Sequence, residues 1–413
     1  MTAKTKTVLV LVHDFPPAGG AGVQRVLKFV KYLPEFGWRS VVVTATPESY
    51  GVIDNTLAGD IPADTPILRV PSFDPNLLLT RCERLRLGMA LSLCNAALFL
   101  PDAAFAWAYR ARPVVRQAIR DYQPVVIFSS ALPASAHMLG QWTRETTGLP
   151  WVTDFRDPWS ENELQPYLPG YRSINRRLEA RVLAASDRIL TVSPPLEEMF
   201  ARLCGDPARV RLIENGYDPE DVAVLPPPET RRFTISYTGE FSRIRRPDAF
   251  VAAIDQLLAA GSIPADEIRV AFAGKDTAKF APDRRPYEQL GYLKHDELSA
   301  LRRDTDLLLL IHGDSAQSRG NYSGKIFEYL GCNRPTLAIT GPDNVAAQLI
   351  TRARAGIATG HSPDEISAAV LRYYRGWKSG VFDYAPDWDI IHHFTRRNLT
   401  GLLAAQFDEM SRT

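Results

Sequence analysis

A chain of 413 residues with 45% hydrophobic and 23% charged residues has the composition of an ordinary soluble globular protein, and is long enough for two or three domains. Its 48 basic and 47 acidic side chains leave a formal net charge of +1, so nothing in the charge balance indicates a nucleic-acid partner. The four cysteines lack CxxC spacing, which disfavours a metal cluster and suits a reducing cytoplasm.

The N-terminal half of the chain alternates strand-like and helix-like segments. Apolar runs predict strands at residues 7–12, 40–44, 125–128, 151–153 and 188–192. Helical periodicity predicts helices at residues 23–33, 134–142 and 174–185. This alternation is typical of an α/β domain built on a doubly wound parallel sheet.

A second alternating series begins near residue 232. Strands are predicted at residues 233–237, 267–273, 306–311 and 335–340. Helices are predicted at residues 247–260 and 296–302. Three consecutive prolines lie between the two series, and prolines cannot continue a helix or an inner strand. We therefore expect two Rossmann-like domains, at 1–222 and 230–385, joined by a linker at 223–229 and separated by a cleft.

No export or membrane-spanning signal is evident. The first apolar run is too short for a signal core, and no stretch approaches the roughly 20 apolar residues that a spanning helix needs. Residues 81–100 pair three arginines with an apolar run, which leaves two interpretations open. The segment is either a buried helix with a solvated arginine edge or a contact with a membrane surface. We expect a cytoplasmic protein, peripheral on the inner face of the cell membrane under the second interpretation.

Ligands of doubly wound sheets bind outside the carboxyl ends of the strands, so the loops after strands hold the candidate residues. The loop after the first strand contains Gly19 and Gly20 directly before a helix. Glycines let the backbone approach a ligand closely, and a helix start favours an anion. The spacing is not GxGxxG, so the loop predicts a phosphate or sugar site rather than a dinucleotide site.

Charged residues follow the strand at 151–153. Asp154, Arg156 and Asp157 are functional candidates because such groups are costly to bury unpaired. A structural Arg–Asp pair that steadies the turn before Pro158 is the alternative. His137 lies on the next helix upstream, where a packed or capping histidine is the alternative to a functional one.

In the second half, Gly239 is followed by a loop with three arginines in four positions, which suits a pyrophosphate or, alternatively, a solvated basic surface. Ser323 and Gly324 then begin a short helix between two strands, where free backbone N–H groups suit phosphate oxygens. Lys325 adds a cation there. Glu328 lies on the same helix face and can accept both hydroxyls of a ribose, unless the two form only a surface Lys–Glu pair.

A metal site is not expected. Asp304 and Asp306 have the Asp-x-Asp spacing of some metal sites, but they lie at the amino end of a predicted strand, the wrong end for a ligand.

Read together, these loops resemble the family 4 glycosyltransferases of the GT-B fold over nearly the whole chain. The motifs that carry the resemblance are Pro16–Gly20, Asp154–Trp159, Ser186–Ser193, Glu214–Asp218, Tyr237–Gly239 and Lys325–Leu330. The resemblance implies a retaining, metal-independent, hexosyltransferase-type enzyme. It needs no cofactor beyond a nucleotide-sugar co-substrate, expected to be a UDP-sugar rather than a GDP-sugar. The C-terminal domain would bind this donor, the N-terminal domain the acceptor, and residues 386–413 would form a helix crossing back to the N-terminal domain.

The resemblance also implies roles for single residues. The donor would be bound by Gly19, Gly20, Gly239, Ser323, Gly324, Lys325 and Glu328. The catalytic residues would be Arg245, Arg246, Lys325 and Asp157, with the arginines stabilising the departing diphosphate. The sugar or acceptor would be contacted by Asp154, Arg156 and His137. Many family members carry a sugar-contacting glutamate where this chain has Gly320, which leaves the donor sugar open.

Three functional hypotheses follow. The first is transfer of a sugar from a nucleotide donor to a glycan or lipid-linked acceptor in surface polysaccharide synthesis. The second is a sugar-nucleotide 2-epimerase on the same fold, with Asp154 or Asp157 as its acid/base group. The third, prompted by Gly320, is a non-catalytic subunit that binds nucleotide sugars.

Overall fold

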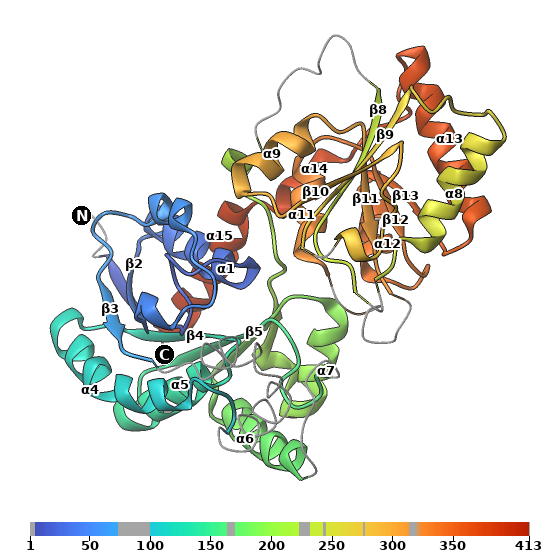
Figure 1. Ribbon diagram of the computed structural model, residues 1–413. Helices are drawn as coiled ribbons and strands as arrows, with labels where there is room; N and C mark the ends of the chain where they lie inside the picture. Colours follow the sequence, from blue (N-terminus) through green and yellow to red (C-terminus); the bar gives the residue numbers. More distant parts are fainter. Residues whose placement is uncertain are drawn as a thin grey trace, which may run out of the picture. The chain divides into compact units, whose positions relative to one another are not determined.

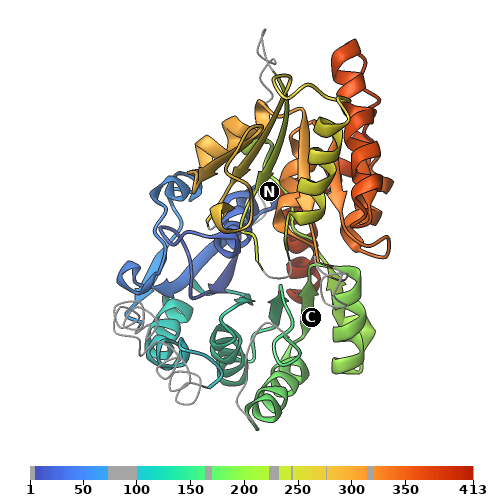
Figure 2. The ribbon, with the colours of Figure 1, turned by 45° about the vertical axis from the view of Figure 1, so that its right-hand side comes forward.

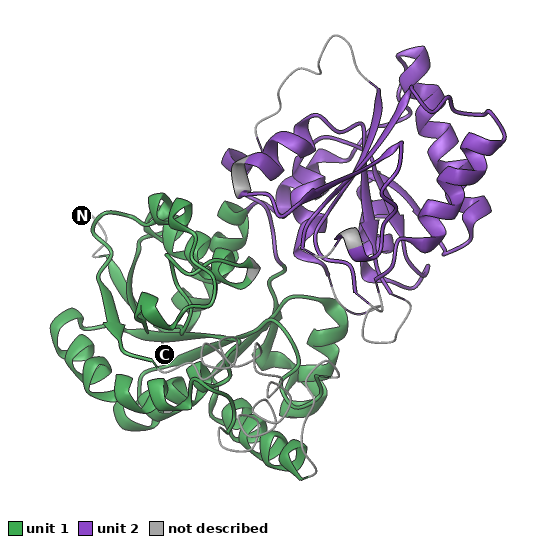
Figure 3. Cartoon of the chain, viewed as in Figure 1, with its two compact units in different colours: residues 1–214, 396–413 green, residues 215–395 purple. Residues whose placement is uncertain are grey.

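A computed structural model describes residues 5–72, 100–162, 170–222, 232–242, 245–275, 277–313, 320 and 322–412 (Figure 1). The chain divides into two compact units, unit 1 with residues 1–214 and 396–413 and unit 2 with residues 215–395 (Figure 3). The predicted linker at 223–229 and the predicted membrane-contact residues 81–99 lie outside the described residues.

Unit 1 is built on a seven-stranded parallel sheet with the strand order β3-β2-β1-β4-β5-β6-β7. Its strands are β1 (Lys6–Leu11), β2 (Trp38–Ala45), β3 (Ile67–Val70), β4 (Val126–Ala131), β5 (Trp151–Phe155), β6 (Arg188–Thr191) and β7 (Val210–Leu212). Its helices are α1 (Ala21–Tyr32), α4 (Phe105–Tyr122), α5 (Ser135–Thr147), α6 (Tyr171–Ala185), α7 (Pro194–Cys204) and α15 (Arg396–Met410). The central strands β1 and β4 are mostly apolar because nearly all of their residues are buried between helices on both faces.

Unit 2 repeats this plan with a six-stranded parallel sheet in the order β10-β9-β8-β11-β12-β13. Its strands are β8 (Phe233–Thr238), β9 (Ile268–Ala273), β10 (Tyr287–Gly291), β11 (Leu307–Ile311), β12 (Thr336–Ile339) and β13 (Gly356–Thr359). Its helices are α8 (Asp248–Ala259), α9 (His295–Arg303), α11 (Gly324–Gly331), α12 (Val345–Arg352), α13 (Pro363–Ser379) and α14 (Trp388–His393).

The alternation of side chains along β11 shows which helices cover each face of this sheet. Leu307 and Leu309 share a core with α8 and α13, whereas Leu308 and Leu310 share a core with α11 and α12. Helices α8 (yellow-green) and α13 (red) lie together beside the strands in both ribbon views (Figures 1 and 2). Both faces are therefore covered, as the doubly wound prediction requires.

The C-terminal segment differs from the predicted single helix. It forms α14 and α15, separated at Phe394 and Thr395. The carbonyl of Phe394 accepts a hydrogen bond from the Tyr217 N–H at 3.0 Å, which takes this carbonyl out of a continuous helical ladder. Helix α15 packs in unit 1, where the Phe407 ring contacts those of Trp38 and Phe128 at centroid distances of 5.2 and 5.8 Å.

Candidate functional site

The loops after β1, β8 and β11 lie at the two points where the strand order reverses, whereas Asp154, Arg156 and Asp157 stand at the end of β5, the strand next to β4. In unit 1 the chain moves outward from β1 through β2 and β3, and then returns to β4 on the other side of β1. In unit 2 it does the same with β8 and β11. Loops leaving two such neighbouring strands turn to opposite faces of the sheet, so a crevice opens at the carboxyl ends between them.

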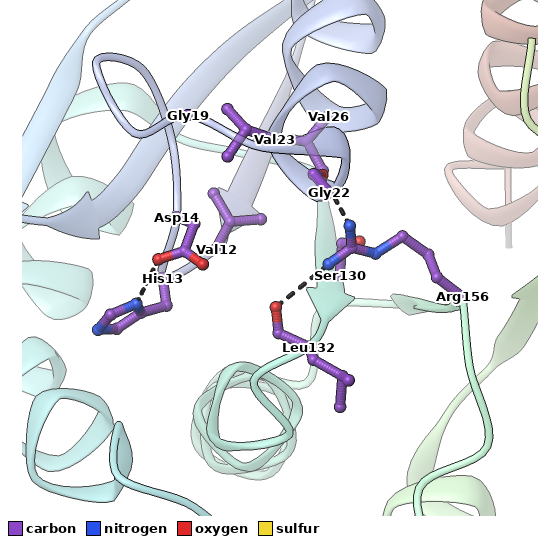
Figure 4. Close-up of a pocket in the computed structure, with 10 residues that line it drawn as sticks. All are labelled: Val12, His13, Asp14, Gly19, Gly22, Val23, Val26, Ser130, Leu132 and Arg156. Atoms are coloured by element: carbon purple, nitrogen blue, oxygen red, sulfur yellow. Dashed lines mark hydrogen bonds and ion pairs between the residues drawn. The ribbon is translucent and has the colours of Figure 1, made fainter. Parts of the chain in front are cut away.

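Unit 1 has a pocket of about 100 Å³ at this position (Figure 4). Its lining combines apolar walls, partly from α1, with a few polar groups from the loop after β1, from β4 and from the turn after β5. The lining residues are Val12, His13, Asp14, Gly19, Gly22, Val23, Val26, Ser130, Leu132 and Arg156.

Arg156 spans this pocket and is held by backbone carbonyls. Its guanidinium donates to the Gly22 carbonyl at 2.7 Å and to the Leu132 carbonyl at 3.1 Å (Figure 4). It also donates to the Ala131 carbonyl. A Cβ atom at Gly22 would lie 2.4 Å from Arg156 Nη1, so only glycine admits the arginine here. The predicted sugar or acceptor residue Arg156 thus lies in the pocket, and its partner Gly22 was not among the predicted site residues.

The two predicted glycines differ in position. Gly19 lines the pocket, and a Cβ atom there would lie 2.9 Å from the Val52 side chain. Gly20 precedes α1 with φ of 110°, a conformation that favours glycine, and no side chain caps the helix. The backbone N–H groups at the start of α1 therefore remain available to a polar ligand.

His13 and Asp14 form a dyad in the same loop. His13 Nδ1 lies 2.7 Å from Asp14 Oδ1, and Nε2 lies 2.9 Å from Ser72 Oγ. The imidazole is nearly buried and stands edge-on to the Trp107 ring at 5.2 Å. Neither residue was among the predicted site residues, although both lie in the loop that follows β1.

Asp154 faces the protein interior rather than the pocket. Its carboxylate accepts three hydrogen bonds from Arg25, at 2.8, 3.1 and 3.2 Å, and one from Ser130 Oγ at 2.7 Å. Arg25 also donates to the carbonyls of Ile213 and Glu214. Burial alone would raise the pKa of Asp154, but Arg25 and Ser130 lower it overall. The structure therefore shows a structural Arg–Asp pair, with Arg25 rather than Arg156 as its partner.

Asp157 and His137 also have distinct environments. Asp157 is half-buried beside Arg156, and burial raises its pKa although the arginine opposes the rise. His137 is fully buried, with Nδ1 2.8 Å from Ser129 Oγ and its ring against Phe155. Burial lowers the pKa of His137 to about 3, so it stays neutral. This is the packed histidine of the alternative interpretation.

Unit 2 places Lys325 at the β8/β11 crevice. The ammonium of Lys325 lies 4.7 Å from the centre of the Tyr237 ring and rests against the backbone of Gly239. A Cβ atom at Gly239 would lie 1.7 Å from Lys325 Nζ, and φ of Gly239 is 136°. Burial and the charge of Arg245 lower the pKa of Lys325 to about 8, against a smaller opposing effect of Glu328.

Helix α11 supplies the remaining predicted donor residues. Ser323 precedes it with no side-chain cap bond, and Gly324 is exposed at its first turn. Glu328 does not pair with Lys325 on the surface. Its Oε2 atom instead lies 2.5 Å from Nη2 of the nearly buried Arg302 on α9. Gly320, at the position where many members of the resembled family carry a glutamate, lies upstream of this helix.

The two predicted arginines are not equivalent. Arg246 pairs with Asp248 at 2.6 Å on an exposed surface at the start of α8. Arg245 pairs through its backbone with Ser242, and its charge acts on Lys325. The structure thus brings Arg245 toward the lysine and engages Arg246 elsewhere.

Among the described helices, none is both long and apolar enough to cross a membrane.

Comparison with known proteins identifies a family and a fold. Residues 18–221 match the family model described as Glycosyltransferase Family 4. No curated protein sequence matches the chain. HepE from Anabaena, solved with UDP and glucose, superposes with a TM-score of 0.65 at 13% identity, covering 98% of this chain and 100% of that chain. Sucrose-phosphate synthase from Thermosynechococcus elongatus superposes with a TM-score of 0.62 at 13% identity, covering 98% of this chain and 99% of that chain.

A putative UDP-N-acetylglucosamine 2-epimerase from Listeria monocytogenes is also similar. It superposes with a TM-score of 0.52 at 11% identity, covering 99% of this chain and 98% of that chain. At these identities the matches establish the fold alone, and a transferase and an epimerase share it. The fold therefore does not separate the first two functional hypotheses.

The sequence match distinguishes them. It spans the Asp154–Trp159, Ser186–Ser193 and Glu214–Asp218 motifs on which the resemblance rested. Two doubly wound units of parallel strands, as found in the GT-B structures above, accompany it. The expected fold and the family resemblance are confirmed, and the family match is carried by residues 18–221.

Proposed function

We propose that this enzyme transfers a hexosyl group from a nucleotide-diphosphate donor to a hydroxyl of a glycan or lipid-linked acceptor, in surface polysaccharide synthesis. Transfer retains the anomeric configuration and uses no metal. The observation that carries the proposal is Lys325, a half-buried cation seated on Gly239 at the β8/β11 crevice, beside the uncapped start of α11. The presence of UDP in the HepE structure supports a UDP-sugar donor.

The donor half of the mechanism concerns the leaving group. As the bond from the anomeric carbon to the diphosphate oxygen breaks, negative charge grows on the diphosphate. Lys325, Arg245 and the N–H groups of α11 stabilise this charge because they are already fixed at the place where it develops. Glu328 accepts the ribose hydroxyls. Gly320 leaves room beside the sugar where other members place a glutamate.

The acceptor half concerns the pocket of unit 1. Hydrogen-bond donors come from Arg156 and the N–H groups at the start of α1, and a hydrogen-bond acceptor comes from Asp14. Together they suit a hydroxylated ligand. The acceptor hydroxyl attacks the sugar on the face that the diphosphate leaves, and its proton passes to a diphosphate oxygen. No strong protein base is required for that step.

A sugar-nucleotide 2-epimerase is the second candidate, and Asp157 favours it. A half-buried carboxyl group with a raised pKa suits acid/base exchange at a sugar carbon. An epimerase converts its nucleotide sugar without an acceptor, so incubation with UDP-N-acetylglucosamine alone separates the two activities.

For location, we propose that the enzyme works at the inner face of the cell membrane and contacts it through residues 81–100. Flotation with anionic liposomes tests this contact. Protein that stays at the bottom of the gradient contradicts it.

A thermal-shift screen across UDP- and GDP-sugars tests the transferase proposal, because a bound ligand stabilises the folded state. We expect stabilisation by one donor class, followed by transfer to an acceptor from a cell extract. Lys325→Ala should abolish both. Lys378→Ala is the matched control, since Lys378 pairs with Glu267 away from this site. Absence of any stabilising nucleotide sugar contradicts the proposal, and binding without transfer favours a non-catalytic subunit.

A further inference from the structure

Arg302 is a buried cation that lies outside every motif of the family resemblance. It projects from α9, only 8% of its side chain is exposed, and Nη2 lies 2.5 Å from Glu328 Oε2. Its Nε atom is buried with no hydrogen-bond partner among the described residues. A guanidinium in this position loses much of its hydration, and one ion pair to Glu328 compensates for it.

The pair is asymmetric in a way that suits ligand binding. The Glu328 side chain is 25% exposed, whereas that of Arg302 is nearly inaccessible. The ion pair joins Arg302 Nη2 to the Oε2 atom of Glu328 from the buried side. An ionised carboxylate has about four acceptor positions. The positions on the exposed side of Glu328 therefore remain for hydroxyl donors.

Charge explains why the pair persists without a ligand. Burial disfavours the charged form of Arg302, but the neighbouring Glu328 carboxylate raises its pKa overall. The guanidinium therefore stays charged and fixes Glu328 by a bond from the interior side. Without that bond, the glutamate side chain can rotate toward solvent or toward the Lys325 ammonium, whose pKa it already influences.

We propose that Arg302 is a positioning residue for the ribose of the donor nucleotide, and that it holds Glu328 so that the carboxylate accepts the ribose hydroxyls. This inference rests on the proposed function, in which Glu328 binds that ribose. Arg302 itself does not touch the ligand. It reduces the conformational freedom that Glu328 would otherwise lose on binding.

Calorimetric titration of UDP, GDP and their 2′-deoxy analogues into the full-length protein tests this role. Wild type should prefer the ribonucleotide. Arg302→Met should weaken ribonucleotide binding about tenfold and leave the 2′-deoxy analogue within about twofold, because only the ribose contact is lost. Arg302→Lys should restore part of the preference, and Glu328→Ala should reproduce the loss.

Arg303→Met is the matched control, because Arg303 lies next on α9 and has no ion pair to Glu328 among the described residues. Equal weakening of both nucleotides by Arg302→Met would show a merely structural role and overturn the inference. Tighter ribonucleotide binding would overturn it too, since Arg302 would then compete with the ribose. If wild type binds no nucleotide, the proposed function itself fails. If wild type binds without a ribose preference, only the ribose role fails.

Discussion

Two Arg–carboxylate pairs among the described residues, Arg25–Asp154 and Arg302–Glu328, differ in how much of the carboxylate they leave exposed. In unit 1, Arg25 and Asp154 are 1% and 0% exposed, and hydrogen bonds from Arg25 and Ser130 occupy the carboxylate. In unit 2, Arg302 and Glu328 are 8% and 25% exposed, with Lys325 nearby and unpaired among the described residues. The first arrangement joins β5, α1 and the chain after β7. The second leaves charge available to a ligand.

We call Arg25–Asp154 the closed pair and the Arg302–Glu328 pair with Lys325 the open site. Loss of the closed pair should have the largest effect on stability. Asp154→Ala leaves Arg25 charged and buried, and we expect it to destabilise unit 1 by ~3–5 kcal/mol in urea unfolding. Glu161→Ala is the control, because its pair with Arg176 is 40% and 59% exposed and should cost ~1 kcal/mol or less. Equal losses would contradict the distinction between closed and exposed pairs.

The closed pair also predicts a pH dependence of stability. The pKa of Asp154 is lowered on folding, so its stabilising contribution is present above its usual value of 3.8 and is lost as the pH falls through the lower folded pKa. Wild type should therefore lose stability below pH 4 faster than Asp154→Ala does. Parallel acid-unfolding curves for the two proteins would argue against this contribution.

The open site should affect activity rather than folding. Lys325→Ala should reduce transfer by about 100-fold or more, since it removes a fixed charge from the leaving diphosphate. Because the pKa of Lys325 is about 8, UDP affinity in wild type should fall as the pH rises above 8. Lys325→Arg should move that fall to higher pH. An unchanged pH profile in Lys325→Arg would remove Lys325 from the diphosphate site.

Arg245 and Arg246 provide a smaller contrast. Arg246 is engaged by Asp248 at the surface, whereas Arg245 acts on Lys325. We expect Arg245→Met to lower kcat about tenfold, as loss of a charged hydrogen bond does, and Arg246→Met to change it less than twofold. Steady-state kinetics measures both losses of kcat. A larger loss in Arg246→Met than in Arg245→Met would contradict this assignment and support a catalytic role for Arg246.

The smallest expected effect concerns the pocket of unit 1. Gly22→Ala places a Cβ atom 2.4 Å from Arg156 Nη1 and should displace the guanidinium. The KM for the acceptor should rise severalfold while that for the donor stays constant. Gly59→Ala is the control, since a Cβ atom there meets nothing within 4 Å. A rise confined to the donor KM would contradict the assignment of this pocket to the acceptor.

The inner strands were predictable from sequence, but the edge strands were not. Every predicted strand is present, and the four that were missed are β3, β7, β10 and β13, the outermost strands of the two sheets. Inner strands of a parallel sheet are buried on both faces and appear as apolar runs. Edge strands are short and partly exposed, so their residues lack that signal. Helix α4 was also missed, since Pro113 interrupts its pattern.

The loops of the candidate site were predictable from sequence, but the ion pairs between arginines and carboxylates were not. Strand ends led to Lys325 and Arg156, because ligands of parallel sheets bind at the carboxyl ends of the strands, and their roles stay predictions. The partners came from elsewhere in the chain. Arg25 lies on the middle of a helix, and Arg302 lies on another, where an arginine normally indicates a solvated face. Only tertiary packing shows that each is buried against a carboxylate.

Hydrogen–deuterium exchange with and without UDP tests the central claim most directly, that unit 2 holds the donor nucleotide. We predict protection at Tyr237–Ser242 and along α11, with less change around the Arg25–Asp154 pair. Protection confined to unit 1, or no protection while UDP is shown to bind, would contradict the account.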